Sequence, residues 1–237
     1  MSEETNTKIY KFAKEIIDKN SSPSHDWQHT MRVYALAMRI ADDLIRQGED
    51  VDIDVLKGSV LLHDIGRRDN FNLKGNLNFG DNFDLREIKV FKSCEKDHAL
   101  ISSEIADAFF KEENINLPAD KKSKILNAVK FHSRKNTHRA DTIELKILQD
   151  ADKLDATGAV GVMRCFAKGG RELYNPDDPF FEKERKLDDK TFCLDHFFRK
   201  LLLLPSLMHT EPAKKIAQQR LRFMENFLNN LKEELIY

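Results

Sequence analysis

Residues 52–68 read DIDVLKGSVLLHDIGRR, and this stretch decides the fold of the 237-residue chain. Its apolar triplet VLL predicts burial, while the aspartates at its start and Gly66 near its end are typical helix start and stop signals. We therefore predict a buried helix that begins near residues 52–54 and ends at Gly66. His63 and Asp64 would then lie at the inner end of this helix.

Asp64 needs a compensating positive charge, because an unpaired carboxylate is costly in a protein core. A metal ion is the simplest compensation, and a salt bridge to Arg67 or Arg68 is the alternative. Further nitrogen and oxygen ligands stand in HDWQHTMRV, residues 25–33, and LQDADKLDA, residues 148–156. Such groups suit Mn²⁺, Fe²⁺, Co²⁺, Ni²⁺ or Zn²⁺ and leave coordination positions for water and substrate. The candidate metal ligands are His29, His63, Asp64 and Asp152.

Helical periodicity dominates the rest of the chain. Apolar stripes over residues 9–17 and 213–231 predict two amphipathic helices. Another helix is expected to begin at Asp26, a good N-cap, and to carry His29 in its first turn. No segment shows a convincing period of two, so we predict an all-α fold. Further helices are expected over residues 95–112, 118–132, 141–153 and 191–204.

Composition sets the outer bounds. With 41% hydrophobic residues and a net charge of −1, the chain can bury a sizeable core and shows no charge excess that favours nucleic-acid or membrane binding. Its three cysteines, Cys94, Cys165 and Cys193, form no paired framework and are expected to be free thiols. No stretch is apolar enough for a signal peptide or a membrane span. We expect a cytoplasmic protein without membrane or duplex nucleic-acid partners; its oligomeric state stays open.

The pattern H…HD…D resembles the signature of the HD-domain superfamily of phosphohydrolases, over residues 24–168. The flanking words DHALISSEIA and FAKGGRELYNP, with the C-terminal segment, are closest to small all-helical bacterial hydrolases often called YedJ- or YpgQ-like. This resemblance implies a single HD-type domain over residues 1–237. Its metal-binding core would span about residues 24–168, with a C-terminal helical extension at about residues 190–235.

The resemblance also selects among neighbouring acidic residues. The superfamily's last aspartate usually follows alanine and precedes a basic or apolar residue and a leucine, which matches Asp152 rather than Asp150. Asp155 lies on nearly the same helical face as Asp152 and is a candidate general base or supporting group. His25 lies one helical turn before His29 and is a candidate substrate-side neighbour, with a structural role equally open.

Four further residues are candidates for substrate binding and catalysis. Arg32 lies one turn after His29, and Lys153 adjoins Asp152, so both are candidates to bind a substrate phosphate. In superfamily members with two metals, histidines between HD and the last aspartate hold a second ion. In one-metal members they contact phosphate or donate a proton to the leaving group, and we favour that role here. The candidates in this interval are His98 and His132.

Two irregular stretches interrupt the helical pattern. Residues 69–84 are rich in asparagine, and residues 169–178 contain GGRELYNPDD. Both are predicted to be loops, and whether either covers the site stays open. The remaining histidines, His138, His196 and His209, match no ligand pattern.

The expected activity is hydrolysis of a phosphate ester or anhydride, with one divalent cation (Mn, Ni, Co, Fe, Mg or Zn) and a second ion possible. Asp64 or Asp155 would orient the attacking water. The resemblance suggests a nucleotide substrate, for example a nucleoside triphosphate cleaved to monophosphate and pyrophosphate. Two alternatives stay open: a catalytically silent ligand-binding HD module, and a di-iron HD oxygenase that needs both His98 and His132 as ligands.

Overall fold

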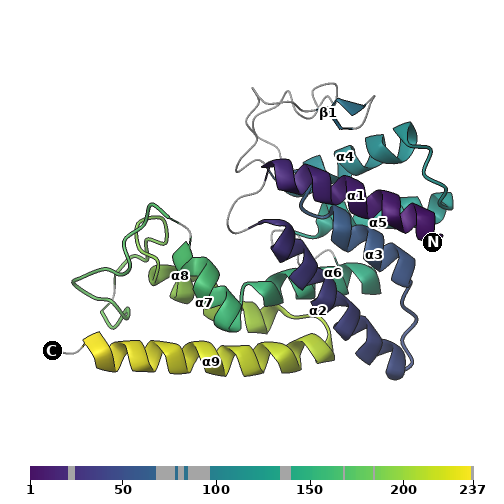
Figure 1. Ribbon diagram of the computed structural model, residues 1–237. Helices are drawn as coiled ribbons and strands as arrows, with labels where there is room; N and C mark the ends of the chain where they lie inside the picture. The colour runs from purple at the N-terminus through teal and green to yellow at the C-terminus, as the bar shows by residue number, and fades with distance from the viewer. Residues whose placement is uncertain are drawn as a thin grey trace. The chain divides into compact units, whose positions relative to one another are not determined.

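The computed structural model is built from helices (Figure 1). It describes residues 1–20, 25–67, 78–79, 83–84, 97–133, 140–167, 169–183 and 185–235. The predicted all-α fold is confirmed, with one small addition: β1 (Asn78–Phe79) pairs antiparallel with β2 (Phe83–Asp84). In the described residues, no helix is long and apolar enough to cross a membrane. The helices are α1 (Glu3–Asn20), α2 (Trp27–Arg46), α3 (Ile53–Leu62), α4 (His98–Glu112), α5 (Ala119–Phe131), α6 (Ile143–Asp155), α7 (Gly158–Ala167), α8 (Asp195–Arg199), the 3₁₀ helix η4 (Leu201–Leu207) and α9 (Glu211–Leu235).

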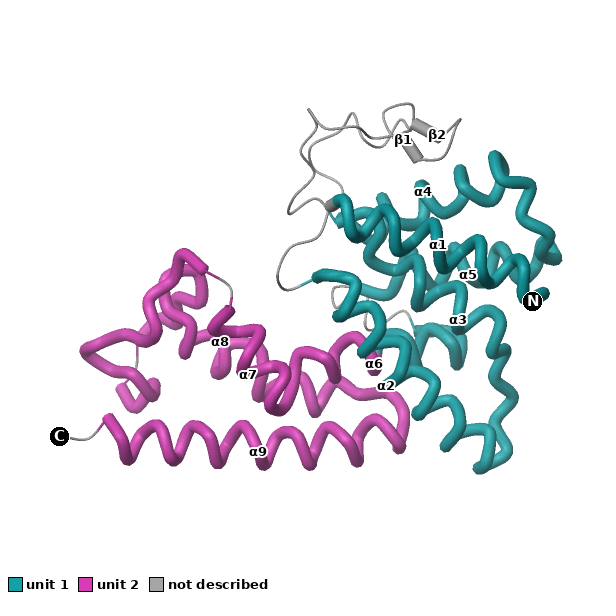
Figure 2. Tube along the Cα trace, in the orientation of Figure 1, with its two compact units in different colours: residues 1–149 teal, residues 150–237 magenta. Residues whose placement is uncertain are grey.

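The chain divides into two compact units, Met1–Gln149 and Asp150–Tyr237, which Figure 2 shows in different colours. The boundary falls inside α6, so this helix contributes its last two turns to the second unit. Each unit is described by itself below. The expectation of one domain over the whole chain stays a prediction.

In the first unit, α3 packs against α1, α2 and α5, and α5 also packs against α4. The apolar stripe of α1 is buried as predicted, and its Phe12 stacks on Phe109 of α4 with ring centroids 3.8 Å apart. Nearly every residue of α3 from Val55 to Leu62 is buried. A helix that is apolar on most sides can only be stable inside a core, which explains its central position.

The starts of α2 and α3 are fixed by the residues that the sequence suggested. Asp26 accepts a hydrogen bond from the His29 amide, and Asp52 accepts from the amides of Asp54 and Val55, as N-caps do. The predicted end of α3 was wrong: the helix stops at Leu62, and a turn follows. Gly66 marks the end of that turn instead.

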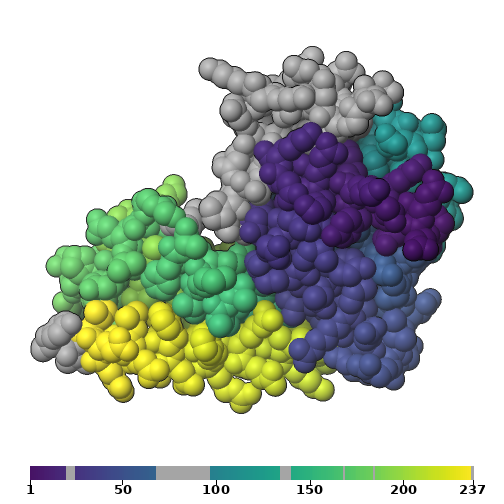
Figure 3. Space-filling view, viewed as in Figure 1, coloured from purple at the N-terminus to yellow at the C-terminus, as the bar shows by residue number. Residues whose placement is uncertain are grey.

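In the second unit, α9 packs against α7 and η4. Figure 3 shows the green surface of α7 lying along the yellow surface of α9. The predicted helix over residues 191–204 was wrong, because α8 ends at Arg199 and the chain continues as η4. Pro205 explains the tighter winding, since proline lacks an N–H donor and disfavours the α conformation of the residue before it.

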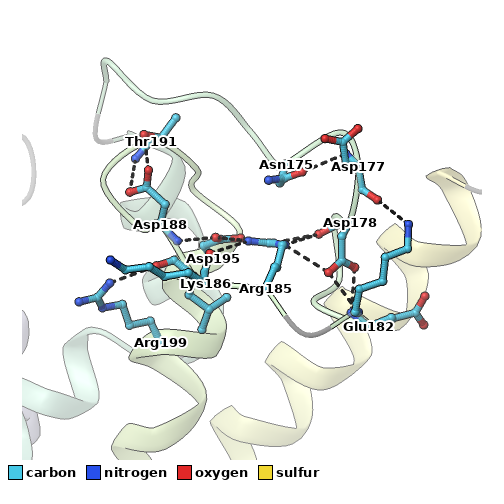
Figure 4. Close-up of polar contacts among 12 residues, drawn as sticks. Asn175, Asp177, Asp178, Glu182, Arg185, Lys186, Asp188, Thr191, Asp195 and Arg199 are labelled. Atoms are coloured by element: carbon cyan, nitrogen blue, oxygen red, sulfur yellow. Dashed lines mark hydrogen bonds and ion pairs between the residues drawn. The ribbon is translucent and has the colours of Figure 1, made fainter.

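A buried ion pair organises the loop before α8 (Figure 4). The guanidinium of Arg185 donates two hydrogen bonds of 2.7 Å to the carboxylate of Asp195, which is fully buried. Arg185 also donates to Asp178, and Asp178 accepts from the amides of Glu182 and Lys183. These hydrogen bonds hold together a segment whose described residues, 178–183 and 185–194, form no helix or strand. Residues 169–178 are irregular, as predicted.

Candidate metal centre

Helix ends of the first unit bring five candidate residues together. His29 lies in the first turn of α2, and His63 follows α3 directly as its C-cap, with Asp64 next. His98 is the first residue of α4, and His132 is the C-cap of α5. The side chains of His29, His63 and His132 are fully buried, and that of Asp64 is 3% exposed. The structure thus places within one cluster residues that are up to 103 positions apart (132 − 29).

The two carboxylate oxygens of Asp64 face different histidine pairs. Its Oδ2 lies 3.5 Å from Nε2 of His29 and 3.7 Å from Nε2 of His63. Its Oδ1 lies 3.4 Å from Nε2 of His132 and 3.6 Å from Nε2 of His98. Two groups of potential metal ligands result, and they share Asp64: one with His29 and His63, the other with His98 and His132.

The hydrogen bonds of the buried histidines fix which nitrogen faces Asp64. Nδ1 of His63 lies 2.7 Å from the carbonyl oxygen of Val60, and Nδ1 of His132 lies 2.7 Å from that of Val129. Because a carbonyl oxygen only accepts, Nδ1 carries a proton, and in the corresponding neutral tautomer Nε2 presents a lone pair. Lone pairs that face a carboxylate oxygen repel it unless a cation or proton lies between them. The donor set therefore fits a divalent cation. Both histidines have the tautomer that metal-binding histidines commonly adopt, with Nδ1 protonated and Nε2 as the ligand atom.

The second group offers the same chemistry at closer range. Nε2 of His98 and Nε2 of His132 are 3.2 Å apart, and both face Oδ1 of Asp64. Nδ1 of His98 lies 3.1 Å from Oδ1 of Asp97, the N-cap of α4. A shared proton or a second cation would satisfy this arrangement equally well.

Arg67 supplies the positive charge nearest to Asp64. Its Nε donates a hydrogen bond of 2.6 Å to Oδ2 of Asp64. Burial alone would raise the pKa of Asp64, but opposing effects, of which the positive charge of Arg67 is the largest, outweigh it and hold the pKa well below the ordinary value. The salt bridge considered as an alternative to a metal therefore forms, and it involves the same oxygen that faces His29 and His63. This salt bridge and the metal ligands are consequently compatible features of one site.

His98 is held in its neutral form. Burial is the main cause that lowers its pKa to about 4, and the positive charge of Arg67 acts in the same direction, against the attraction of Asp64. The ring is therefore neutral near pH 7 and able to accept a proton or to bind a metal.

Asp150, Asp152, Lys153 and Asp155 belong to the second unit. Asp150 is fully buried and accepts hydrogen bonds from the amides of His209 and Thr210, so it anchors the residues that lead into α9. Lys153 donates to the carbonyl oxygen of Leu207 at 3.1 Å. Asp155 pairs with Arg164. The expected roles of Asp152 as ligand, Lys153 as phosphate contact and Asp155 as base stay predictions; Asp152 itself is half-buried, on a different face of α6 from Asp150.

The remaining candidates have varied surroundings. The ring of His25 lies edge-on to that of His29, with centroids 5.4 Å apart, and Arg32 is half-buried on α2. His196 bonds to Asp189 in the second unit. His209 lies 3.4 Å from the Lys153 ammonium group. His138 and most of the predicted 69–84 loop lie outside the described residues.

Two supporting residues were not predicted. Asp97 contacts Nδ1 of His98, and Ser102 accepts a hydrogen bond from the Gly66 amide through its Oγ at 2.9 Å. The signal for Asp97 was available, because an aspartate directly before a helix-starting histidine is a typical N-cap. Ser102 carries no comparable signal, since its role depends on how α4 packs against the turn at Gly66.

An all-α unit that gathers histidines and an aspartate at its helix ends is the arrangement of a metal-binding hydrolase fold. The chain belongs to the HD domain family, whose model matches residues 26–157. It is 30% identical over 222 residues to the Bacillus subtilis protein YpgQ, covering 91% of this chain and 87% of YpgQ.

Solved structures agree with this assignment. An HD-superfamily hydrolase from Bacillus thuringiensis aligns with a TM-score of 0.66 and 28% identity, over 98% of this chain and 96% of that one. YpgQ in complex with ADP aligns with a TM-score of 0.62 and 24% identity, over 98% of both chains, and supports the fold. The fold is thus that of an HD-superfamily hydrolase.

Proposed function

We propose that this protein hydrolyses a phosphate ester or anhydride of a nucleotide and depends on a divalent cation. The observation that carries the proposal is the convergence of His29 Nε2 and His63 Nε2 on Asp64 Oδ2, at 3.5 and 3.7 Å. These three residues would hold the cation, and we propose Asp152 as the fourth ligand on its sequence pattern. Mn²⁺ suits this donor set, as do Ni²⁺, Co²⁺, Fe²⁺, Zn²⁺ and, less well, Mg²⁺.

A bound divalent cation would lower the pKa of water and polarise a phosphoryl oxygen. The chain's own residues would supply the remaining steps. Asp64 or Asp155 would orient the attacking water, and Arg32 and Lys153 would offset negative charge on the phosphoryl oxygens. As the water oxygen bonds to phosphorus, the bond to the leaving oxygen breaks. His98 or His132 would take up the proton that the attacking water releases and pass it to that leaving oxygen.

A nucleotide is the substrate class that we favour. The relative YpgQ has been crystallised in complex with ADP, and the chain is 30% identical to YpgQ over most of its length. Within this class we propose a nucleoside triphosphate, cleaved to a monophosphate and pyrophosphate. Phosphate groups would also match the cationic and imidazole groups around Asp64.

A binuclear centre is the second candidate, and the group formed by Asp64, His98 and His132 favours it. Asp64, His98 and His132 would hold a second cation beside the one held by His29, His63 and Asp64. Two metals serve hydrolases that clamp both the attacking and the leaving oxygen. Two irons in the same positions would instead support an oxygenase, which an absorption spectrum of the purified protein distinguishes.

The test combines metal analysis with a hydrolysis screen over nucleoside tri-, di- and monophosphates, cyclic dinucleotides and a generic phosphodiester. His63→Ala and Asp64→Ala should lose bound metal and activity, with helicity measured by circular dichroism largely retained. His196→Ala is the matched control, because His196 is a partly buried histidine of the second unit, bonded to Asp189. Wild-type metal content in both site variants would exclude the proposed centre. Intact metal without turnover of any tested substrate would instead favour a silent ligand-binding module.

The fourth ligand has its own comparison. Asp152→Asn should lose metal far more severely than Asp150→Asn. The latter removes the charge that accepts hydrogen bonds from the two amides before α9, and it should mainly lower thermal stability. The reverse order of metal loss would show that the sequence pattern was aligned two residues too late.

A further inference from the structure

Arg67 lies at the edge of the cluster that solvent reaches. Of the side chains that contact Asp64, those of His29, His63 and His132 are fully buried, whereas those of Arg67 and His98 are each 24% exposed. A substrate that enters from solvent must therefore meet Arg67 and His98 before the buried ligands.

The position of Arg67 is fixed from two sides. Its amide donates a hydrogen bond of 3.1 Å to the carbonyl oxygen of Asp64, and its Nε donates to the Asp64 carboxylate. The preceding Gly66 is bonded to Ser102 and packs closely against the backbone of α4. Little freedom is left to the turn, so the guanidinium group is presented at one place beside His98.

The chemistry of the guanidinium allows two tasks at once. Arginine has five N–H donors in a planar fork, and the contact with Asp64 uses the one on Nε. The same fork matches a phosphate group through paired, charge-assisted hydrogen bonds. Of the two partly exposed side chains that contact Asp64, Arg67 and His98, Arg67 carries a guanidinium group, whose positive charge is permanent.

We propose that Arg67 binds a phosphate group of the substrate at the solvent side of the centre, while its Nε–H holds Asp64 in place. The inference rests on the proposed function and deepens it, because it assigns a substrate-binding residue that the H…HD…D pattern does not include. The alternative role for Arg67 is that of a counter-charge to Asp64 alone. The two roles predict different losses when Arg67 is replaced: phosphate binding is lost in the first, and only the charge partner of Asp64 in the second.

The experiment measures binding of inorganic phosphate and ADP by calorimetry at saturating Mn²⁺, and binding of Mn²⁺ alone. Arg67→Gln should weaken ADP binding about tenfold or more, as expected when a charge-assisted hydrogen bond is removed, with a smaller effect on Mn²⁺ affinity. Arg67→Lys should recover part of the loss, since lysine keeps the charge but lacks the fork. Arg46→Gln is the control for net charge, because Arg46 is exposed on α2 and pairs with Asp43; it should leave both affinities unchanged.

Equal ADP affinity of the Arg67→Gln and unaltered proteins at saturating Mn²⁺ would overturn the inference, even if Mn²⁺ binds more weakly. Hydrolysis assays on the same samples separate this failure from that of the proposed function. Turnover by the unaltered protein with an unchanged KM in Arg67→Gln would refute the role of Arg67 alone. If Arg67→Gln specifically loses phosphate and ADP binding but the unaltered protein hydrolyses no nucleotide, the binding role of Arg67 is supported and the proposed hydrolase function is refuted. If the unaltered protein binds neither probe, both proposals fail.

Discussion

Gly66→Ala tests whether the turn after α3 must touch α4 for the centre to form. A methyl group on Gly66 would lie 2.4 Å from the amide nitrogen of Ser102 and 2.8 Å from the carbonyl oxygen of His98. Both atoms belong to the backbone, so no side-chain rotation relieves the overlap. Since ordinary contact begins at 3.4 Å, the turn must retreat by about 1 Å (3.4 − 2.4). That shift also stretches the 2.9 Å hydrogen bond from Gly66 to Ser102.

The cost follows from these two effects. Overpacking of this kind costs about 1–3 kcal/mol and a weakened hydrogen bond about 1 kcal/mol, so the free energy of unfolding should fall by roughly 2–4 kcal/mol. The melting temperature should then drop by roughly 5–15 °C. Because Asp64 sits in the same turn, its Oδ1 should also move away from His98, and Mn²⁺ should bind more weakly.

The assays are thermal unfolding followed by circular dichroism and titration with Mn²⁺ below the melting temperature. Gly169→Ala is the matched control, because a methyl group there meets no atom within 4 Å. Similar melting temperatures and Mn²⁺ affinities for the two alanine variants would refute the packing argument.

Three further predictions concern protonation, the second unit and metal content. The pKa of His98 is about 4 in the folded protein, against 6.5 for an unperturbed histidine. Between these two pH values the unfolded chain binds more protons than the folded protein. The stability of the metal-free protein should therefore be full above pH 6.5 and fall as the pH is lowered toward 4. Urea unfolding should show a flatter pH dependence in His98→Asn, and an unchanged slope would contradict this. Arg185→Leu leaves the buried Asp195 carboxylate without its bidentate partner and should cost about 3 kcal/mol in denaturant unfolding; a loss below about 1 kcal/mol would mean that the pair is dispensable. In a one-metal site, His132→Ala should lower turnover or substrate affinity at constant metal content, whereas loss of one of two ions would show a binuclear centre.

The sequence predicted those parts of the fold that depend on local patterns. The stripe of α1, the caps Asp26 and Asp52, and the buried character of α3 follow from periodicity and side-chain hydrogen bonding, which neighbouring residues determine. The positions at which helices end were less predictable. α3 ends four residues before Gly66 because the turn is held by contacts with α4, and such contacts between distant segments leave no local pattern.

The candidate centre likewise has features that the sequence predicted and features that it did not. Residue types and order indicated His29, His63 and Asp64 as ligands, and the structure brings them together. It also brings His98 and His132 to the other oxygen of Asp64. The sequence had indicated that these two histidines lie near the substrate, but not where. The direction in which each oxygen points depends on the packing of four helices. No spacing along the chain encodes that direction.

One feature of the centre nevertheless has a local origin. His63 and His132 both follow the last residue of a helix, and each donates from Nδ1 to the carbonyl oxygen of the valine three residues earlier. The last carbonyls of a helix lack intrahelical donors, so an imidazole at this position satisfies one of them and directs Nε2 beyond the helix end. The words VLLH and VKFH are thus two copies of one device that presents a nitrogen lone pair to Asp64. The two buried Nε2 atoms and the shared carboxylate then need a cation or a proton between them, and the carboxylate supplies negative charge that a cation would neutralise.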